Sequence, residues 1–141
     1  MGQVFAISIG SKKGASKRTV DRAYLRENHG IEGDCHAGAG HRQVSLLACE
    51  DVLALRTRGI EAKPGDFAEN LLIEGMSLTG IQVGSKLQVG DTLLEITEIG
   101  KPEWKEGDYS FEGIALVARS GLFARVIEGG WIRTGDSVVV R

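Results

Sequence analysis

The chain of 141 residues is poor in cysteine, proline and aromatic residues, and its formal net charge is only −2. Two cysteines are too few for a disulfide framework, so we expect a reducing compartment, the cytoplasm. The small net charge gives no general attraction to nucleic acid or to a membrane surface. No apolar run reaches the roughly 20 residues of a membrane-spanning helix. The lysines near the N-terminus follow a short apolar stretch instead of preceding it, unlike a secretory signal.

Glycine, in contrast, is abundant, and the 20 glycines are spread along the whole chain. This distribution predicts many short strands joined by tight turns. The length suits one domain, residues 1–141, that buries a core of its own. The expected fold class is therefore mainly β, with a few short helices.

Short apolar or alternating runs between the glycines predict strands. The predicted strands are Val4–Ile9, Thr19–Glu27, Arg42–Leu47, Leu71–Ile73, Ile81–Val83, Lys86–Val89 and Leu93–Ile99. A helix is predicted over Glu50–Arg58, with Val52, Leu53 and Leu55 on one face, because its acids come early and its arginines late and Gly59 can end it. Two further short helices are predicted, Asp66–Asn70, capped by Asp66, and Ser120–Glu128, with Leu122, Phe123 and Val126 turned inward.

Two segments repeat one pattern of strand, Gly-Asp turn and strand, namely KLQVGDTLLEI (86–96) and WIRTGDSVVVR (131–141). Asp91 and Asp136 can each hold the turn through its own backbone while the glycine takes an unusual dihedral angle. Repeated hairpin-like units of this kind favour a closed or nearly closed sheet.

The stretch Gly30–Val52 concentrates the groups that can bind or react. It holds four glycines followed closely by an apolar run, and between them the candidate site residues Asp34, Cys35, His36, His41 and Arg42. Reactive groups on a glycine loop anchored by a buried strand are a common way to present a site. A second polar loop, residues 10–18, carries four positive charges and is either a solvated turn or an anion-binding lip.

Each candidate also has a plain structural interpretation. Cys35 beside a histidine can be a nucleophile, although small buried cysteines are common; Cys49, by the same argument, is expected to pack. His36 and His41 can ligate a metal, bind an anion together with Arg42, or brace the loop. The spacing matches no zinc signature, so no metal site is predicted. Asp34 is expected to brace the loop.

Six fragments taken in order point to a family: GIEGDCHAG with HRQVSLL, then KPGDFAENLLIEG, then LEITEIGK, and finally GLFARVIEGG with IRTGD. From about Val4 to Val140 the chain resembles the MOSC domain, the C-terminal domain of molybdenum-cofactor sulfurases, in its small stand-alone bacterial form. The resemblance implies a β-barrel with a few short helices. It also implies binding of the molybdenum cofactor (molybdopterin), with sulfur delivery or a reductase activity on N-hydroxylated substrates in some members. The pyridoxal-phosphate binding often attached to the family belongs to a separate aminotransferase-like domain, for which this chain has no room.

One departure from the family pattern affects the expected chemistry. Family members place a cysteine soon after the strand that corresponds to Leu93–Ile99, and here Glu103 stands at that position. A carboxylate cannot hold a persulfide. The sequence therefore favours a pterin-binding or carrier module over the alternative, a sulfurtransferase or reductase-like enzyme that uses Cys35 or a partner's thiol; a scaffolding role is the third possibility.

The resemblance also suggests further site residues and partners. It places Glu69 and Asn70 near the glycine loop, and a phosphorylated pterin needs positive partners. The candidates for these are Lys12, Lys13, Lys17, Arg18, Arg42 and, favoured among them, Lys101. Trp104 can stack on a flat heterocycle. A cysteine desulfurase or a molybdoenzyme is the expected protein partner, and a homodimer is compatible with a small barrel.

Overall fold

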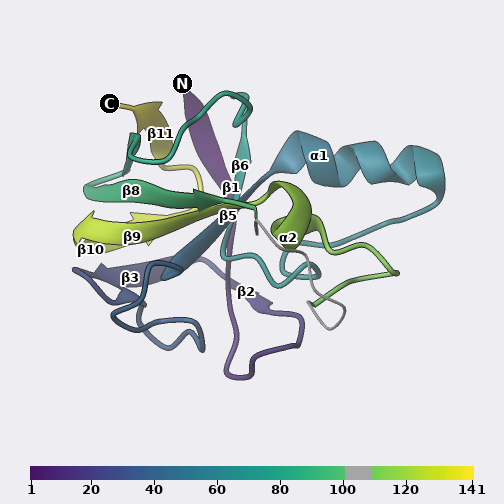
Figure 1. Cartoon of the computed structure of the whole chain (residues 1–141), viewed down its shortest axis with the longest axis horizontal. Helices are drawn as coiled ribbons and strands as arrows, with labels where there is room; N and C mark the ends of the chain where they lie inside the picture. Colours follow the sequence, from purple (N-terminus) through teal and green to yellow (C-terminus); the bar gives the residue numbers. More distant parts are fainter. Residues whose placement is uncertain (101–108) are drawn as a thin grey trace.

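A computed structural model describes residues 1–100 and 109–141, and in it short strands wrap into a barrel with the helices on one side (Figure 1). The strands are β1 (Gly2–Ile9), β2 (Arg18–Val20), β3 (Arg22–Arg26), β4 (Gly30–Ile31), β5 (Val44–Ala48), β6 (Leu71–Glu74), β7 (Lys86–Val89), β8 (Thr92–Ile99), β9 (Leu122–Glu128), β10 (Gly130–Arg133) and β11 (Ser137–Val140). The helices are α1 (Cys49–Ala54), which continues into the 3₁₀ helix η1 (Leu55–Arg58), and α2 (Leu116–Ser120).

The barrel closes because β1 pairs on one side with β6 and on the other with β11. The ring runs β1, β11, β7, β8, β9, β5 and β6, and only the pair β5–β6 is parallel. Strand β2 adds to the far part of β1, and β10, β3 and β4 form a second, three-stranded sheet. The predicted fold class, a mainly β closed sheet with a few short helices, is confirmed. Both chain ends lie together, since Gly2 pairs with Val138 (Figure 1).

Strand β5 is buried along its whole length, which explains why all of its residues except Ser45 are apolar. One face, with Val44 and Leu46, belongs to the barrel core. The other face, with Leu47, packs in a second cluster under α1 and η1, together with Val52 and Leu55. A central strand covered on both faces is a rigid base for the loop that precedes it.

The helix predicted over Glu50–Arg58 is confirmed as α1 with η1. Gly59 ends it in the left-handed conformation (φ 78°), where a side chain would be strained. Val52 and Leu55 point inward as predicted, but Leu53 is 46% exposed. Neighbouring residues of an α-helix point about 100° apart, so Leu53 turns toward solvent while Val52 faces the core. None of the helices in the described residues is long and apolar enough to cross a membrane.

The helix predicted over Ser120–Glu128 was wrong, because most of this segment is strand β9. Leu122, Phe123 and Val126 are buried as expected, but they pack between β8 and β5. The short apolar run fits either a helix or a strand, and pairing with two distant strands decides between them. A five-residue helix, α2, ends just before it, at Ser120.

Three other segments differ from their predictions. Ile81–Val83 is not a strand, because it lies in turns between Gly80 and Gly84, both with positive φ. Asp66–Asn70 is not helical: Ala68 has a φ of 62°, which breaks a right-handed helix, and the carboxylate of Asp66 accepts a hydrogen bond from the backbone N–H of Lys63. The strand Thr19–Glu27 is interrupted at Asp21, and its two parts, β2 and β3, enter different sheets.

The two Gly-Asp turns join strands in different ways. The first makes a hairpin, in which β7 pairs with β8. The second connects β10 to β11, which lie in separate sheets, so this turn is a corner and not a hairpin. Asp136 does hold its own turn, since its carboxylate accepts a hydrogen bond from the N–H of Arg133 at 2.8 Å. The two turns also meet, because the N–H of Gly90 donates to the carbonyl of Ser137.

Candidate functional site

The glycine loop between β4 and β5 is closed at its base by tight backbone contact. Gly30 has a φ of 120°, and a Cβ atom there would lie 2.8 Å from the carbonyl oxygen of Gln43. Gln43 is buried, and its amide nitrogen donates to the side chain of Asn28 and to the carbonyl of Gly40, while its amide oxygen accepts from the N–H of Val126. Gln43 therefore ties the loop to β9. No local sequence pattern marks Gln43 as a residue of the site.

Asp34 is the buried centre of the loop. One carboxylate oxygen, Oδ1, accepts hydrogen bonds from the ammonium of Lys17 at 2.7 Å and from the N–H of Gly10 at 3.0 Å. The other oxygen accepts from the N–H of His36 at 3.1 Å. Burial by itself would raise the pKa of Asp34, but the hydrogen bond and charge of Lys17, helped by the two amides, lower it below its usual value. Asp34 braces the loop, as the sequence suggested.

Lys17 belongs to the loop of residues 10–18 but is not a solvated cation. Its side chain is fully buried, like that of Asp34. Its backbone N–H also donates to the carbonyl of Gly65, and a Cβ on Gly65 would lie 2.1 Å from the carbonyl oxygen of Lys17. Lys17 thus links β1, the glycine loop and the segment before β6.

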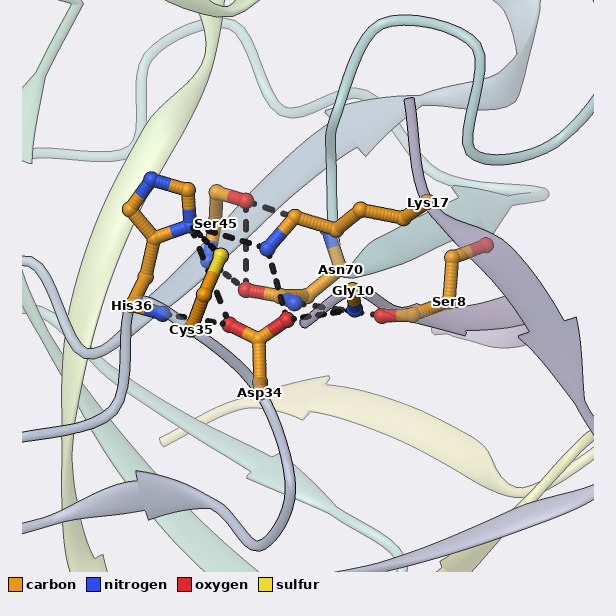
Figure 2. A network of polar contacts seen from close by, with 8 residues as sticks. All are labelled: Ser8, Gly10, Lys17, Asp34, Cys35, His36, Ser45 and Asn70. Carbon is orange, nitrogen blue, oxygen red and sulfur yellow. Dashed lines mark hydrogen bonds and ion pairs between the residues drawn. The ribbon is translucent and has the colours of Figure 1, made fainter. Parts of the chain in front are cut away.

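His36 and Cys35 are adjacent to this buried ion pair (Figure 2). The Nδ1 atom of His36 lies 2.9 Å from the ammonium of Lys17 and 3.5 Å from Sγ of Cys35. Cys35 is half-buried and is not in a disulfide, and its N–H donates to the carbonyl of Gly10. The loop therefore brings one thiol, one imidazole and one ammonium to a single point. Cys49, buried at the start of α1, lies elsewhere.

Asp34, Cys35 and His36 offer three ligand atoms within 4.8 Å of one another, the one such group found in the described part of the chain. The ammonium of Lys17, however, already bonds both the carboxylate of Asp34 and Nδ1 of His36. A metal ion bound by these atoms would have to displace a buried cation from its counter-ion. The ion pair between Lys17 and Asp34 therefore competes with any metal ion for these ligand atoms.

Arg42 and His41 lie on the other limb of the loop and share one acid, Glu98 of β8. Arg42 forms a bidentate ion pair with Glu98, at 2.5 and 3.0 Å, and its guanidinium lies 5.3 Å from the ring centre of Phe123. Nε2 of His41 is 3.4 Å from the same carboxylate. The hydrogen bond from Arg42 is the main cause of the lowered pKa of Glu98. Glu98 was not among the predicted site residues, because it is 56 positions away from Arg42.

Asn70 lines the cavity wall together with His36 and Arg42, whereas Glu69 contacts the turn before β6, and both side chains are buried and hydrogen-bonded. The carboxyl of Glu69 accepts hydrogen bonds from the N–H groups of Gly65 and Phe67. Burial raises its pKa to about 7 against the effect of these bonds. The amide of Asn70 accepts from the N–H of Ser45 and donates to the carbonyl of Ser8. These two residues hold β6, β5 and β1 in register at this end of the barrel.

A cavity of about 140 Å³ opens beside the loop. Its wall contains His36 and Arg42 from the glycine loop, and Asn70. The aromatic rings of the wall are Phe67, Tyr109 and Phe123. Burial, followed by the charges of Asp66 and Glu69, raises the pKa of Tyr109, whose hydroxyl donates to the carbonyl of Asp66. The cavity wall thus combines aromatic rings with polar side chains, and Arg42 and Phe123 are in direct contact.

A second, wider hollow of about 400 Å³ is also lined by His36 and Arg42. Lys13 and His41 line it together with backbone of Gly38 and Gly40. His36 and Arg42 are therefore a shared wall between the two spaces. Three of the predicted residues, His36, His41 and Arg42, come together here, whereas Lys101, Glu103 and Trp104 fall outside the described residues.

Comparison with known families identifies the domain. The model of the MOSC domain matches residues 32–139, most of the chain and all of the elements from the glycine loop to β11. The chain belongs to the MOSC family. Among curated protein sequences, none matches it.

Solved structures with the same fold include three bacterial proteins. The YuaD protein from Bacillus subtilis aligns with a TM-score of 0.75 at 18% identity, over 97% of this chain and 93% of that one. YiiM from Geobacillus stearothermophilus gives 0.75 at 19% identity, over 100% and 75%, and YiiM from Escherichia coli gives 0.69 at 20%, over 100% and 70%. Identities this low establish the fold and leave the ligand to be argued from this chain's own residues.

Proposed function

We propose that this MOSC protein binds the molybdenum cofactor, or a related phosphorylated pterin, at the shared wall of His36 and Arg42, and that it acts as a binding or carrier module. The observation that carries the proposal is the pairing of two spaces of different character. The first space is bounded by aromatic rings, and the second is bounded by basic side chains and by glycine-rich backbone.

The aromatic space suits the flat ring of a pterin. Phe67 lies in the turn before β6, Phe123 lies in β9, and the hydroxyl of Tyr109 is hydrogen-bonded to the carbonyl of Asp66. Aromatic side chains supply large, rigid contact surfaces, and a planar heterocycle can stack against them. The polar wall residues Asn70 and Ser45 are hydrogen-bonded to each other, so their side chains are already fixed in position.

The wider space suits the phosphate group. The charges of Lys17 and Asp34 cancel, and those of Arg42 and Glu98 largely cancel too. The remaining positive charge comes from Lys13, and His41 and the loop amides near Gly38 and Gly40 can add donors. A phosphate would compete with Glu98 for Arg42 and His41, so binding would loosen the ion pair between the loop and β8.

The group, when bound, supplies the redox and sulfur chemistry of molybdenum, and this chain's residues hold and orient it. His36 and Arg42 would contact it from the glycine loop, and Phe123 would contact it from β9. No described cysteine lines either space, and therefore the donor set fits the pterin and phosphate rather than a thiolate bond to the metal.

A second function, transfer of sulfur through Cys35, is favoured by one contact. Sγ of Cys35 lies 3.5 Å from Nδ1 of His36, and the ammonium of Lys17 lies 2.9 Å from the same nitrogen, so the thiol is next to two polar groups that can position a sulfur-bearing substrate. Its test is cyanolysable sulfur on the protein after incubation with a cysteine desulfurase and cysteine. Sulfur that disappears in Cys35→Ser would establish this function, and its absence would remove it.

Binding is tested by purifying the chain from a host that makes the cofactor, followed by assays for molybdenum and for oxidised pterin fluorescence. The proposal predicts stoichiometric pterin on the wild-type protein and a strong loss in Phe123→Leu, a change that keeps a buried apolar residue in β9. Pterin retained equally by Phe123→Leu, or absent from the folded wild-type protein, would contradict the proposal.

A further inference from the structure

The outer face of the three-stranded sheet exposes two aromatic rings beside two arginines. β3 and β10 pair antiparallel, with Ala23 opposite Ile132, and these two side chains are buried. The alternate positions point outward, away from the core. We call the exposed set Arg22, Tyr24, Trp131 and Arg133 the arginine–aromatic face.

Two large rings on this face stay in contact with solvent. Trp131 is 52% exposed and Tyr24 is 38% exposed. They are direct cross-strand partners that meet edge to face, with ring centres 5.4 Å apart. The guanidinium of Arg22 lies 4.9 Å from the centre of the Trp131 ring, within the range of a cation–π contact. The face is therefore ordered before anything binds to it.

The charges on the face are unbalanced. Arg22 lies directly opposite Arg133 in the register of the two strands, and like charges in that position destabilise a sheet. Neither arginine forms an ion pair with a carboxylate of the described residues, whereas Arg26, next along β3, pairs with Glu32 at 2.8 Å. The carboxylate of Asp136 is held by a backbone N–H of its own turn. Since the whole chain has a net charge of −2, this local excess is not general basicity.

We propose that the arginine–aromatic face is a docking surface for an acidic segment of a partner protein, with carboxylates on Arg22 and Arg133 and an apolar side chain against Trp131. Tryptophan, tyrosine and arginine are the residues that carry most of the binding energy at protein interfaces. Two arginines on an acidic chain do not form the extended basic stripe that nucleic acid requires.

The face is separate from the ligand site. None of its four residues lines the cavity or the adjoining hollow. A protein that carries a small molecule to another protein needs a docking surface in addition to its ligand site. Because the two share no residue here, a partner on the arginine–aromatic face leaves the ligand site accessible. The docking proposal does not depend on which ligand the cavity holds.

The test uses fluorescence anisotropy with a short labelled peptide of aspartate and glutamate residues around two leucines, at low salt. The proposal predicts saturable binding that weakens with salt, and a loss of about tenfold or more in affinity for Arg133→Thr and for Trp131→Ala. Arg58→Ala is the matched control, because Arg58 is an exposed arginine on η1, and it should bind like the wild-type protein. The thermal midpoint of Arg133→Thr should be equal to or above that of the wild-type protein, because the substitution removes a like-charge pair.

Other outcomes would overturn the proposal. No saturable binding, or an equal loss in Arg58→Ala, would mean that the face does not recognise acidic segments. A single-stranded oligonucleotide that binds more tightly than the peptide through the same residues would make it a nucleic-acid surface. Concentration-dependent dimers in sedimentation that disappear in Trp131→Ala would show that a second copy of this chain covers the face. A lower thermal midpoint for Arg133→Thr would mark the arginine as structural.

Discussion

The ammonium nitrogen of Lys17 lies 2.9 Å from Nδ1 of His36. An ammonium group only donates hydrogen bonds, so this ring nitrogen must accept, and the neutral imidazole carries its proton on Nε2. Sγ of Cys35, at 3.5 Å, faces the same nitrogen. One lone pair cannot serve both partners, and therefore His36 does not act as a base toward Cys35 while Lys17 holds it. This relationship favours the binding function over sulfur transfer.

Lys17→Met should strongly destabilise the fold. The substitution keeps much of the buried side chain but leaves the carboxylate of Asp34 buried without its cation, and breaking a buried ion pair in this way costs about 3–5 kcal/mol. Lys13→Met, in the same loop but exposed, is the control and should change stability by less than about 0.5 kcal/mol. Urea unfolding measures both. Equal stabilities for the two variants would show that the Lys17–Asp34 pair contributes nothing.

The pH dependence of stability should contain a contribution from Asp34 at the acid end. Its pKa is lower in the folded protein than the ordinary value of 3.8, so the stabilisation is present above that value and is lost as the pH falls through the folded pKa. We expect wild-type protein to be more stable than Asp34→Asn at pH 6 and the difference to shrink below about pH 4. Unfolding free energies measured across this range would contradict the assignment if the difference stayed constant.

Glu69 should act in the opposite direction. Burial raises the pKa of Glu69 from 4.5 to about 7. Its contribution to folding stability is therefore fully present below pH 4.5 and is lost as the pH rises through 7. A shift of this size corresponds to about 3 kcal/mol at neutral pH, as an order of magnitude. Glu69→Gln keeps one acceptor for the loop amides and should flatten the stability profile between pH 5 and pH 8. A variant that follows the wild-type profile would exclude Glu69 as the titrating group.

Gly65→Ala should disturb the site end of the barrel. The residue has a φ of 89°, and a Cβ would lie 2.1 Å from the carbonyl oxygen of Lys17, so backbone has to move. Gly80→Ala is the control, since Gly80 has a similar φ of 90° with no atom within 4 Å of the added Cβ. The control should lose about 1 kcal/mol from the strained dihedral, and Gly65→Ala several times more. Similar losses in chemical denaturation would show that the close approach of Gly65 to Lys17 is unimportant.

Local patterns in the sequence predict much of the barrel. The apolar run of β5, the charge order of α1 and the Gly-Asp turn of the first hairpin are local signals, and each was read correctly. The prediction of a helix in place of β9 is wrong because a short apolar run such as LFARV suits the periodicity of a helix as well as that of a strand, and only pairing with other strands decides between them. Whether β10 and β11 pair with each other depends on which sheet each strand joins, and no local pattern encodes that.

The site could be located from the sequence but not assembled from it. The density of glycine, histidine and acid over residues 30–42 marks the loop, and His36 and Arg42 do share a wall of one cavity. Lys17 looked like its neighbours in a basic run, although it alone among them is buried against Asp34. The contacts of Glu98 and Gln43 join segments more than 50 residues apart, and only the closed barrel brings them together.

Equilibrium dialysis of purified molybdopterin against three proteins tests the central claim most directly. The wild-type protein should bind, and His36→Ala should bind about 10–100-fold more weakly, as expected for the loss of a hydrogen bond to a charged ligand. His29→Ala, a histidine that lines neither space, should bind like the wild type. Equal affinities for all three proteins, or no binding by the wild type, would contradict a pterin site at the shared wall of His36 and Arg42.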